Sequence, residues 1–280
     1  MSITTIRVIT DNYVFGGNFR AEHGFSALVE HNGKRIIFDF GKTPEVFRFN
    51  FSQIGVSADE IDVGVISHGH YDHTGGVAEL LKLRHPALPI FAHPEIFSNR
   101  FALDPDGNLR YIGMYWSKQY LEGLGADFRF STEPVEIFED VWFSGEIPRD
   151  LGFEGRSPRF RVEVDGFMME DIIPDDASLF VKTDEGLVVV VGCCHSGLLN
   201  TIDYAIRITG EGKIRLVIGG THLSGYPPEK LHELFRKLEE YEVEEFRLSH
   251  CTGLVPFAEL YKRYPDKTKP TRAGEVIQIG

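Results

Sequence analysis

The sequence of 280 residues contains only three cysteines, two of them adjacent, which is too few for a framework of disulfides. It also lacks any apolar run close to the roughly 20 residues that a membrane-spanning helix requires. Its first residues do not combine a basic stretch with an apolar one, as a secretory signal would. We therefore expect a cytoplasmic protein with no membrane partner.

Positive charge is scarce, because 29 Lys and Arg face 42 Asp and Glu and give a net charge of −13. A broad nucleic-acid-binding face needs a basic surface, so we expect no nucleic-acid partner. A small anionic substrate remains compatible, since bound metal ions reverse the local potential. The chain has no internal repeat, low-complexity segment or linker, and it is long enough for one large core. We expect a single domain over residues 1–280.

One short stretch carries most of the chemical information. Residues 61–66 are largely apolar and β-branched, which predicts a buried strand. Directly after it come His68, His70, Asp72 and His73, and then a helix over 77–83. Alternation along an extended segment places His68 and His70 on the same side, so both can bind one ion. Asp72 and His73 come next and can face a second ion. Imidazole and carboxylate groups at this density predict a site for divalent transition metal.

This H-x-H-x-D-H pattern at a strand end resembles the signature of the metallo-β-lactamase superfamily. The resemblance implies an α/β fold, a four-layer αββα sandwich, with a metal site, usually binuclear, at one edge between the two sheets. Asp39, which ends the expected strand 35–40 before Gly41, matches the first motif of the superfamily. Its implied role is to accept a hydrogen bond from a metal-binding histidine.

Two further apolar strands end in histidine. The strand 187–192 precedes Cys193, Cys194 and His195, and the strand 245–248 precedes His250, which matches the last motif of the superfamily. Most members have a bridging Asp where this chain has Cys193. Two arrangements stay open: Cys193 bridges two ions, or His195 alone completes the first site while Cys193 supports it. Cys194, one step along the strand, is expected to point into the core.

Other candidates concern substrate. Asp72 and His222 are the candidate catalytic residues, because His222 follows a Gly-Gly-Thr turn where an imidazole can contact an anion or act as a general acid. The alternative for His222 is a buried, hydrogen-bonded histidine. Thr221 beside it and Arg149 are candidate contacts to a substrate anion. His93 precedes Pro94 in a turn and is expected to be structural.

Residues 96–150 fit the superfamily pattern least well and are expected to form an insertion or an elaborated arm. They are rich in aromatic residues, which favour plain core or dimer contacts over stacking on a planar ligand. A homo-oligomer is therefore left open.

Four motifs together are similar to one subgroup of the superfamily: those around His68, Cys193, His222 and His250. This subgroup includes the archaeal 7,8-dihydropterin-6-methyl-4-(β-D-ribofuranosyl)aminobenzene 5′-phosphate synthases. The resemblance implies condensation of a dihydropterin-methyl pyrophosphate with an arylamine and release of pyrophosphate. The alternatives are a metal-dependent hydrolase of phosphoesters or lactones and a non-catalytic metal-binding protein. The expected cofactor is two divalent ions per chain, zinc first, with iron, manganese or magnesium also compatible.

Overall fold

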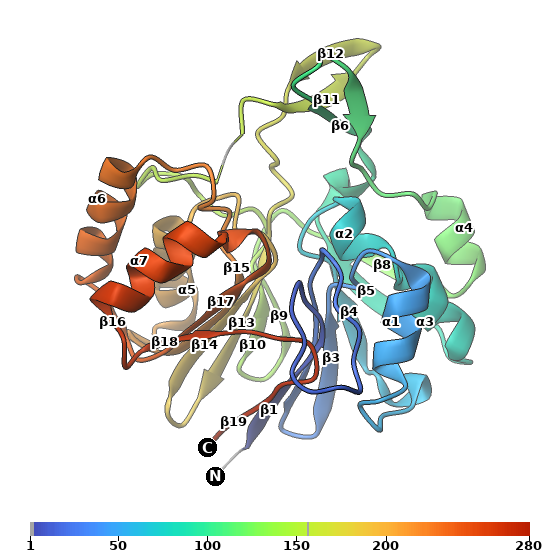
Figure 1. The fold of residues 1–280 in the computed structure, drawn as a ribbon. Coiled ribbons are helices and arrows are strands. Elements are labelled where there is room, and N and C mark those ends of the chain that lie inside the picture. The colour runs from blue at the N-terminus through green and yellow to red at the C-terminus, as the bar shows by residue number, and fades with distance from the viewer. Residues whose placement is uncertain (1–2, 156) are drawn as a thin grey trace.

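The computed structural model describes residues 3–155 and 157–280, and its architecture is a sandwich of two large sheets with helices on both outer faces (Figure 1). The first sheet has the order β19-β1-β2-β3-β4-β5-β8. Its strands are Val276–Ile279 (β19), Thr4–Thr10 (β1), Ser26–His31 (β2), Lys34–Phe38 (β3), Val63–Val65 (β4), Leu88–Ala92 (β5) and Ala126–Phe130 (β8). Because β1 and β19 pair, the first and last strands of the chain lie side by side.

The second sheet has the order β18-β17-β15-β14-β13-β10-β9, and the short β16 also pairs with β15. Its strands are Thr268–Pro270 (β18), Phe246–Ser249 (β17), Lys213–Gly220 (β15), Gly186–Val191 (β14), Ser178–Thr183 (β13), Val141–Phe143 (β10), Val135–Phe138 (β9) and Glu242–Val243 (β16). In each sheet, the strands nearest the site run parallel, namely β3, β4 and β5 in the first and β14, β15 and β17 in the second.

Three apolar clusters hold the four layers together. Alternate residues of the two sheets, such as Val8 and Val190, point between them and form the central core. The outer face of the first sheet is covered by Pro44–Phe51 (α1), Val77–Leu83 (α3) and Lys118–Gly123 (α4). The outer face of the second sheet is covered by Leu198–Thr209 (α5), Pro228–Leu238 (α6) and Leu254–Arg263 (α7). This arrangement confirms the expected αββα sandwich.

A third, four-stranded sheet projects from the sandwich above the edge where the two large sheets meet (Figure 1). Its order is β12-β11-β6-β7, with strands Phe167–Glu170, Phe160–Val164, Arg100–Leu103 and Leu109–Tyr111. We call it the arm. The segment 96–150 is thus divided: its first part builds half of the arm, while α4, β8, β9 and β10 belong to the main layers.

Several boundaries differ from the sequence-based expectation for local reasons. The strand expected at 61–66 is limited to β4, since Ile61 still caps the short 3-10 helix Ala58–Glu60. The strand β13 begins at Ser178, after a turn that contains the buried Asp175 and Asp176. The helix α1 begins at Pro44, because the Thr43 side chain caps it by accepting a hydrogen bond from the Val46 N–H. Asn32 and Gly33 form the tight turn between β2 and β3, with φ values of 49° and 75°.

No helix within the described residues is both long and apolar enough to cross a membrane.

Candidate metal centre

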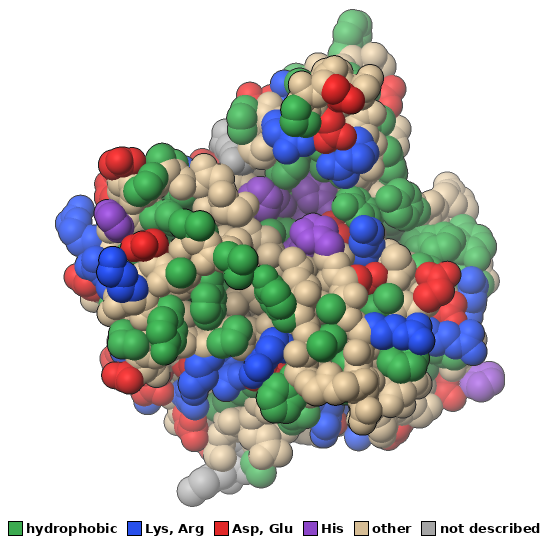
Figure 2. All heavy atoms as spheres, viewed as in Figure 1, with side chains coloured by type: hydrophobic (Ala, Val, Ile, Leu, Met, Phe, Trp, Pro, Cys, Tyr) green, Lys and Arg blue, Asp and Glu red, His purple; other side chains and the backbone are tan. Residues whose placement is uncertain are grey.

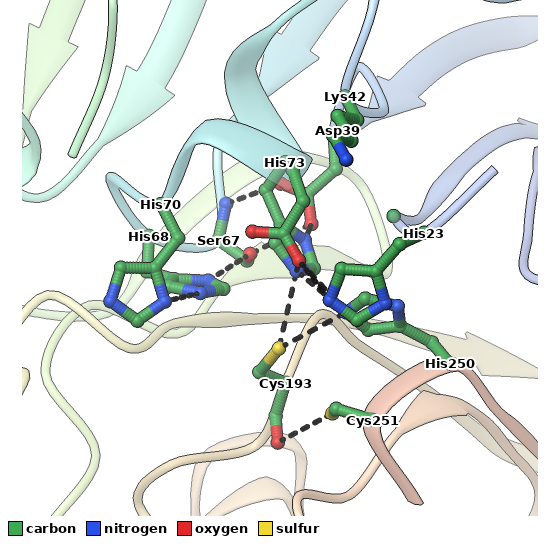
Figure 3. A network of polar contacts seen from close by, with 12 residues as sticks. His23, Asp39, Lys42, Ser67, His68, His70, His73, Cys193, His250 and Cys251 are labelled. Carbon is green, nitrogen blue, oxygen red and sulfur yellow. Dashed lines mark hydrogen bonds and ion pairs between the residues drawn. The ribbon is translucent and has the colours of Figure 1, made fainter. Parts of the chain in front are cut away.

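The two large sheets meet below the arm at one edge of the sandwich (Figure 1), and side chains from both sheets converge there (Figure 3). The H-x-H-x-D-H loop follows β4, and its last part forms the short helix Tyr71–Thr74 (α2). Cys193 and His195 follow β14, His222 follows β15, and His250 begins the 3-10 helix His250–Thr252 after β17. Because parallel strands end at the same edge of a sheet, residues far apart in sequence meet here.

The first group of metal donors consists of His68, His70 and His195, whose nearest ring nitrogens all lie within 4.8 Å of one another. His68 Nε2 lies 3.0 Å from His70 Nδ1. His195 Nδ1 lies 3.0 Å from the Gly155 carbonyl oxygen and donates to it, which leaves the Nε2 lone pair free. The Nε2 atoms of His70 and His195 are buried and have no hydrogen-bond partner among the described residues. Buried polar atoms without partners are costly, so this geometry fits a bound cation.

The second group surrounds His73. Its Nε2 lies 3.2 Å from both Cys193 Sγ and His250 Nε2, and the last two atoms are 3.4 Å apart. Asp72 Oδ2 lies 3.4 Å from His250 Nε2 and 3.9 Å from His73 Nε2. Since Cys193 also groups with His68 and His73, its sulfur lies between the two donor sets. The structure therefore brings together every residue that the sequence predicted as a metal ligand.

Asp39 fixes the orientation of the H-x-H-x-D-H loop through hydrogen bonds. Its Oδ2 accepts from His73 Nδ1 at 2.6 Å and from Ser67 Oγ at 2.7 Å, while Oδ1 accepts from the Ser67 N–H at 2.8 Å. Because Ser67 Oγ donates to Asp39, it accepts from His68 Nδ1 at 2.9 Å. Both histidines thus carry hydrogen on Nδ1 and present Nε2 to the centre, as metal-binding histidines do. A Cβ on Gly192 would lie 2.2 Å from Ser67 Oγ, which explains the glycine there.

Burial sets the protonation of the donors. It lowers the pKa of His195 to about 3 and lowers the pKa values of His68, His70 and His250 well below the usual range, so these rings are neutral. Burial works against ionisation of Asp72, but the neighbouring His73 and other histidines hold the pKa of Asp72 well below its usual range. Burial also raises the pKa of the Cys193 thiol. His73 differs: burial lowers its pKa, but the carboxylates of Asp39 and Asp72 outweigh this effect and raise the pKa to about 9, so a cation would have to displace a proton there. Neutral imidazoles and an ionised carboxylate are the forms that bind cations.

A cavity of about 300 Å³ opens beside the donors, and Figure 2 shows histidine side chains in the hollow below the arm. Its wall includes Tyr71, Phe160 and Arg110, together with His222. The His222 ring centroid lies 4.4 Å from that of His195 and 5.6 Å from that of Phe160. Burial lowers the pKa of His222 to about 3, so its ring is neutral near pH 7.

Two predicted substrate contacts lie outside the lining of this cavity. Thr221 is buried, and its Oγ1 lies 2.9 Å from Thr252 Oγ1. Arg149 forms an ion pair with Glu154 at 3.1 Å and donates to the Ile173 carbonyl at 2.6 Å. Both residues support the chain near the site, and Arg110 is the arginine that lines the cavity.

Other residues have the positions expected for structural roles. His93 Nδ1 accepts from the Glu95 N–H at 3.2 Å and caps the 3-10 helix Pro94–Phe97. Cys194 is buried in the core and its Sγ lies 3.3 Å from Thr201 Oγ1.

Sequence reasoning assigned no role to three residues at the site. His23 lies over Asp72 and His250, Cys251 lies beside Cys193, and Arg110 comes from the arm. The triplet Glu22-His23-Gly24 was the only local signal for the first of these, since its partners are distant in sequence.

Comparison with known proteins agrees with this geometry. Residues 20–167 match the metallo-beta-lactamase superfamily. The chain is 30% identical to the 7,8-dihydropterin-6-methyl-4-(beta-D-ribofuranosyl)-aminobenzene-5'-phosphate synthase of Methanocaldococcus jannaschii, over 98% of this chain and 96% of that protein. It is 33% identical to an uncharacterized protein of the same organism, over 91% of this chain and 93% of the relative.

Among solved structures, Tm1679, described as a metal-dependent hydrolase of the beta-lactamase superfamily, superposes with a TM-score of 0.84 at 28% identity and covers 99% of both chains. The chain belongs to the metallo-beta-lactamase superfamily.

Proposed function

We propose that this protein is a metal-dependent enzyme that joins a dihydropterin-methyl pyrophosphate to an arylamine and releases pyrophosphate. The observation that carries the proposal is the pair of donor groups at the floor of a cavity with aromatic and cationic walls. The similarity to a protein named as a synthase of this type, over nearly the whole chain, supports the choice of substrate.

The donor set fits two divalent ions. His68, His70 and His195 would hold the first, and Asp72, His73 and His250 the second, with the Cys193 sulfur between them. Zinc suits this mixture of nitrogen, oxygen and sulfur, and iron or manganese is also compatible. When bound, such ions neutralise negative charge that develops on phosphate oxygens or lower the pKa of a water molecule.

The remaining residues of the cavity suit the rest of the substrate. Tyr71 and Phe160 provide aromatic faces for a planar ring system, and Phe160 lies 5.5 Å from the His70 ring. Arg110 brings a positive charge to the same cavity, where it can bind an anionic group. Neutral His222 can form a hydrogen bond to the substrate. A small anionic substrate, with no nucleic-acid or membrane partner, is part of this proposal.

Hydrolysis is the second candidate, because the same donor groups suit attack by water and because Tm1679 is described as a hydrolase. In that case the substrate is a phosphoester or lactone and no amine is required. The two candidates share the metal centre and differ in the substrate and in the group that attacks it.

A single assay separates them. We would measure pyrophosphate release from a dihydropterin-methyl pyrophosphate by the metal-loaded protein, with and without an aminobenzene ribofuranosyl phosphate. The transferase predicts release that depends on the amine and is lost in His70→Ala. Release without the amine would indicate hydrolysis, and no release in either case would remove this substrate and direct the search to phosphoesters and lactones.

A further inference from the structure

His23 has a position that the superfamily motifs do not account for. It lies in the loop between β1 and β2, yet its Nε2 is 3.1 Å from Asp72 Oδ2. Its ring centroid is 4.6 Å from that of His250, and Figure 3 shows the two rings next to each other. A ring nitrogen of His23, an Asp72 oxygen and a ring nitrogen of His250 all lie within 4.8 Å of one another. These three groups have the composition and spacing of a cation site.

The loop that carries His23 is built to hold it there. Glu22 on one side is anchored, because its Oε1 accepts from the Lys42 N–H at 2.9 Å and its Oε2 accepts from Thr43 Oγ1 at 2.7 Å. On the other side, a Cβ on Gly24 would lie 2.5 Å from the Asp72 carbonyl oxygen, so only glycine allows this close approach. Phe25 then donates its N–H to the same carbonyl at 3.3 Å. Glu22 is thus fixed against the loop at Lys42 and Thr43, and Gly24 is fixed against the metal loop at Asp72.

Asn12 connects His23 to His250, one of the candidate metal donors. Its Oδ1 accepts from His250 Nδ1 at 3.1 Å and from the Gly24 N–H at 3.3 Å, and its Nδ2 donates to the His250 carbonyl at 3.3 Å. With hydrogen on Nδ1, His250 presents Nε2 toward Asp72. One asparagine therefore positions His250 and the backbone beside His23 at the same time.

We propose that His23 is a metal ligand, which binds the second ion together with Asp72 and His250 from the cavity side. The inference rests on the two-ion site of the proposed function. In the structure, the His23 Nε2–H donates to Asp72, and a cation would take the place of that hydrogen. The His23 side chain lines the cavity and is 49% exposed, whereas those of His73 and His250 are buried, so His23 would approach the ion from the open side of the site.

Metal binding by itself tests the inference. Protein freed of metal by a chelator would be titrated with Zn²⁺ under equilibrium dialysis and with Co²⁺ under visible spectroscopy, for wild type, His23→Ala and His23→Gln. His85→Ala is the matched control, since His85 is 90% exposed and bonds Asp59 away from the site. Metal-free melting temperatures would show that the variants fold.

We expect both His23 variants to keep the first ion and to bind the second about 10-fold to 100-fold more weakly than wild type does. Their Co²⁺ spectra should also change, whereas His85→Ala should behave as wild type. Glutamine keeps an N–H donor for Asp72, so a purely hydrogen-bonding role predicts that His23→Gln restores binding, and that result would overturn the inference. Unchanged binding in His23→Ala would overturn it too. A wild-type protein that binds fewer than two ions would instead refute the two-ion site of the proposed function, so the two failures are distinguishable.

Discussion

Four residues at the metal centre have a left-handed backbone conformation that side chains other than glycine rarely adopt. Asp39, Cys194, His222 and His250 have φ values of 56°, 55°, 46° and 51°. Each follows the end of a strand, where the chain must turn sharply to present a side chain at the sheet edge. Such conformations cost roughly 1 kcal/mol or more each and persist where the surroundings enforce them. Their concentration here indicates that the surrounding structure holds the sharp turns at these strand ends, two of which place His222 and His250 at the site.

Asp11 offers a prediction about pH at the residue scale. It is completely buried, it accepts hydrogen bonds from Ser249 Oγ and the Tyr13 N–H, and burial raises its pKa from 3.8 to about 7. Below about pH 4 both the folded and the unfolded forms are protonated. As the pH rises toward 7, the unfolded form releases its proton and the folded form does not, so the free energy of unfolding decreases; above 7 this contribution is constant.

We therefore expect Asp11→Asn to remove this decrease. The free energy of unfolding of the variant minus that of wild type should be about 2–4 kcal/mol larger at pH 8 than at pH 4.5. One pKa unit corresponds to about 1.4 kcal/mol. Urea denaturation of metal-free protein at the two pH values measures the change. An equal stability difference at both values would contradict the raised pKa.

At the scale of elements, the end of helix α2 packs closely against the backbone of the loop that follows β3. The Gly75 N–H donates to the Gly41 carbonyl at 2.9 Å, and a Cβ on Gly75 would lie 1.8 Å from the Lys42 carbonyl oxygen. We expect Gly75→Ala to lower the free energy of unfolding by about 3 kcal/mol, because neither backbone can move freely. Gly123→Ala is the control, since a Cβ there meets nothing within 4 Å and alanine favours the helix. Equal melting temperatures for the two variants would refute the close packing.

The arm is tied to the metal loop by one buried arginine. Arg100 on β6 is completely buried, donates to Asp171 at 2.8 Å and to Asp175 at 2.8 Å, and Asp175 accepts from the Gly69 N–H at 2.8 Å. We expect Arg100→Met to destabilise the fold by about 3–5 kcal/mol, because two buried carboxylates lose their cation. Chemical denaturation measures this loss. Arg129→Met, which removes an exposed pair with Asp127, should leave stability nearly unchanged, and a similar loss in both variants would argue against the buried network.

At the scale of the whole molecule, the candidate metal donors come from both large sheets, so a bound ion would join the two halves of the sandwich. A ligand that binds only the folded state stabilises it, by about 2.7 kcal/mol at a concentration 100 times its dissociation constant. We expect chelation to lower the melting temperature by several degrees and added Zn²⁺ to restore it. His70→Ala should show a smaller response to Zn²⁺, and a response equal to that of wild type would exclude His70 as a ligand.

The local parts of this centre were predictable from the sequence. His68, His70, Asp72 and His73 lie in one loop, where the spacing along the chain fixes which side chains can share an ion. The strand ends at Cys193 and His250 were also readable, because an apolar run followed by polar residues and glycine marks the edge of a sheet. The layered fold was predicted by the family resemblance that these motifs carry.

Tertiary structure alone decided the remainder. His23 meets Asp72 and His250 only because β1 and β2 lie beside the metal loop, and Arg110 reaches the cavity only because the arm folds over it. Thr221 and Arg149 looked suitable by residue type, yet hydrogen bonds to Thr252 and Ile173 hold them elsewhere. Sequence spacing constrains residues within a few positions of each other, whereas contacts between distant segments depend on how the layers pack.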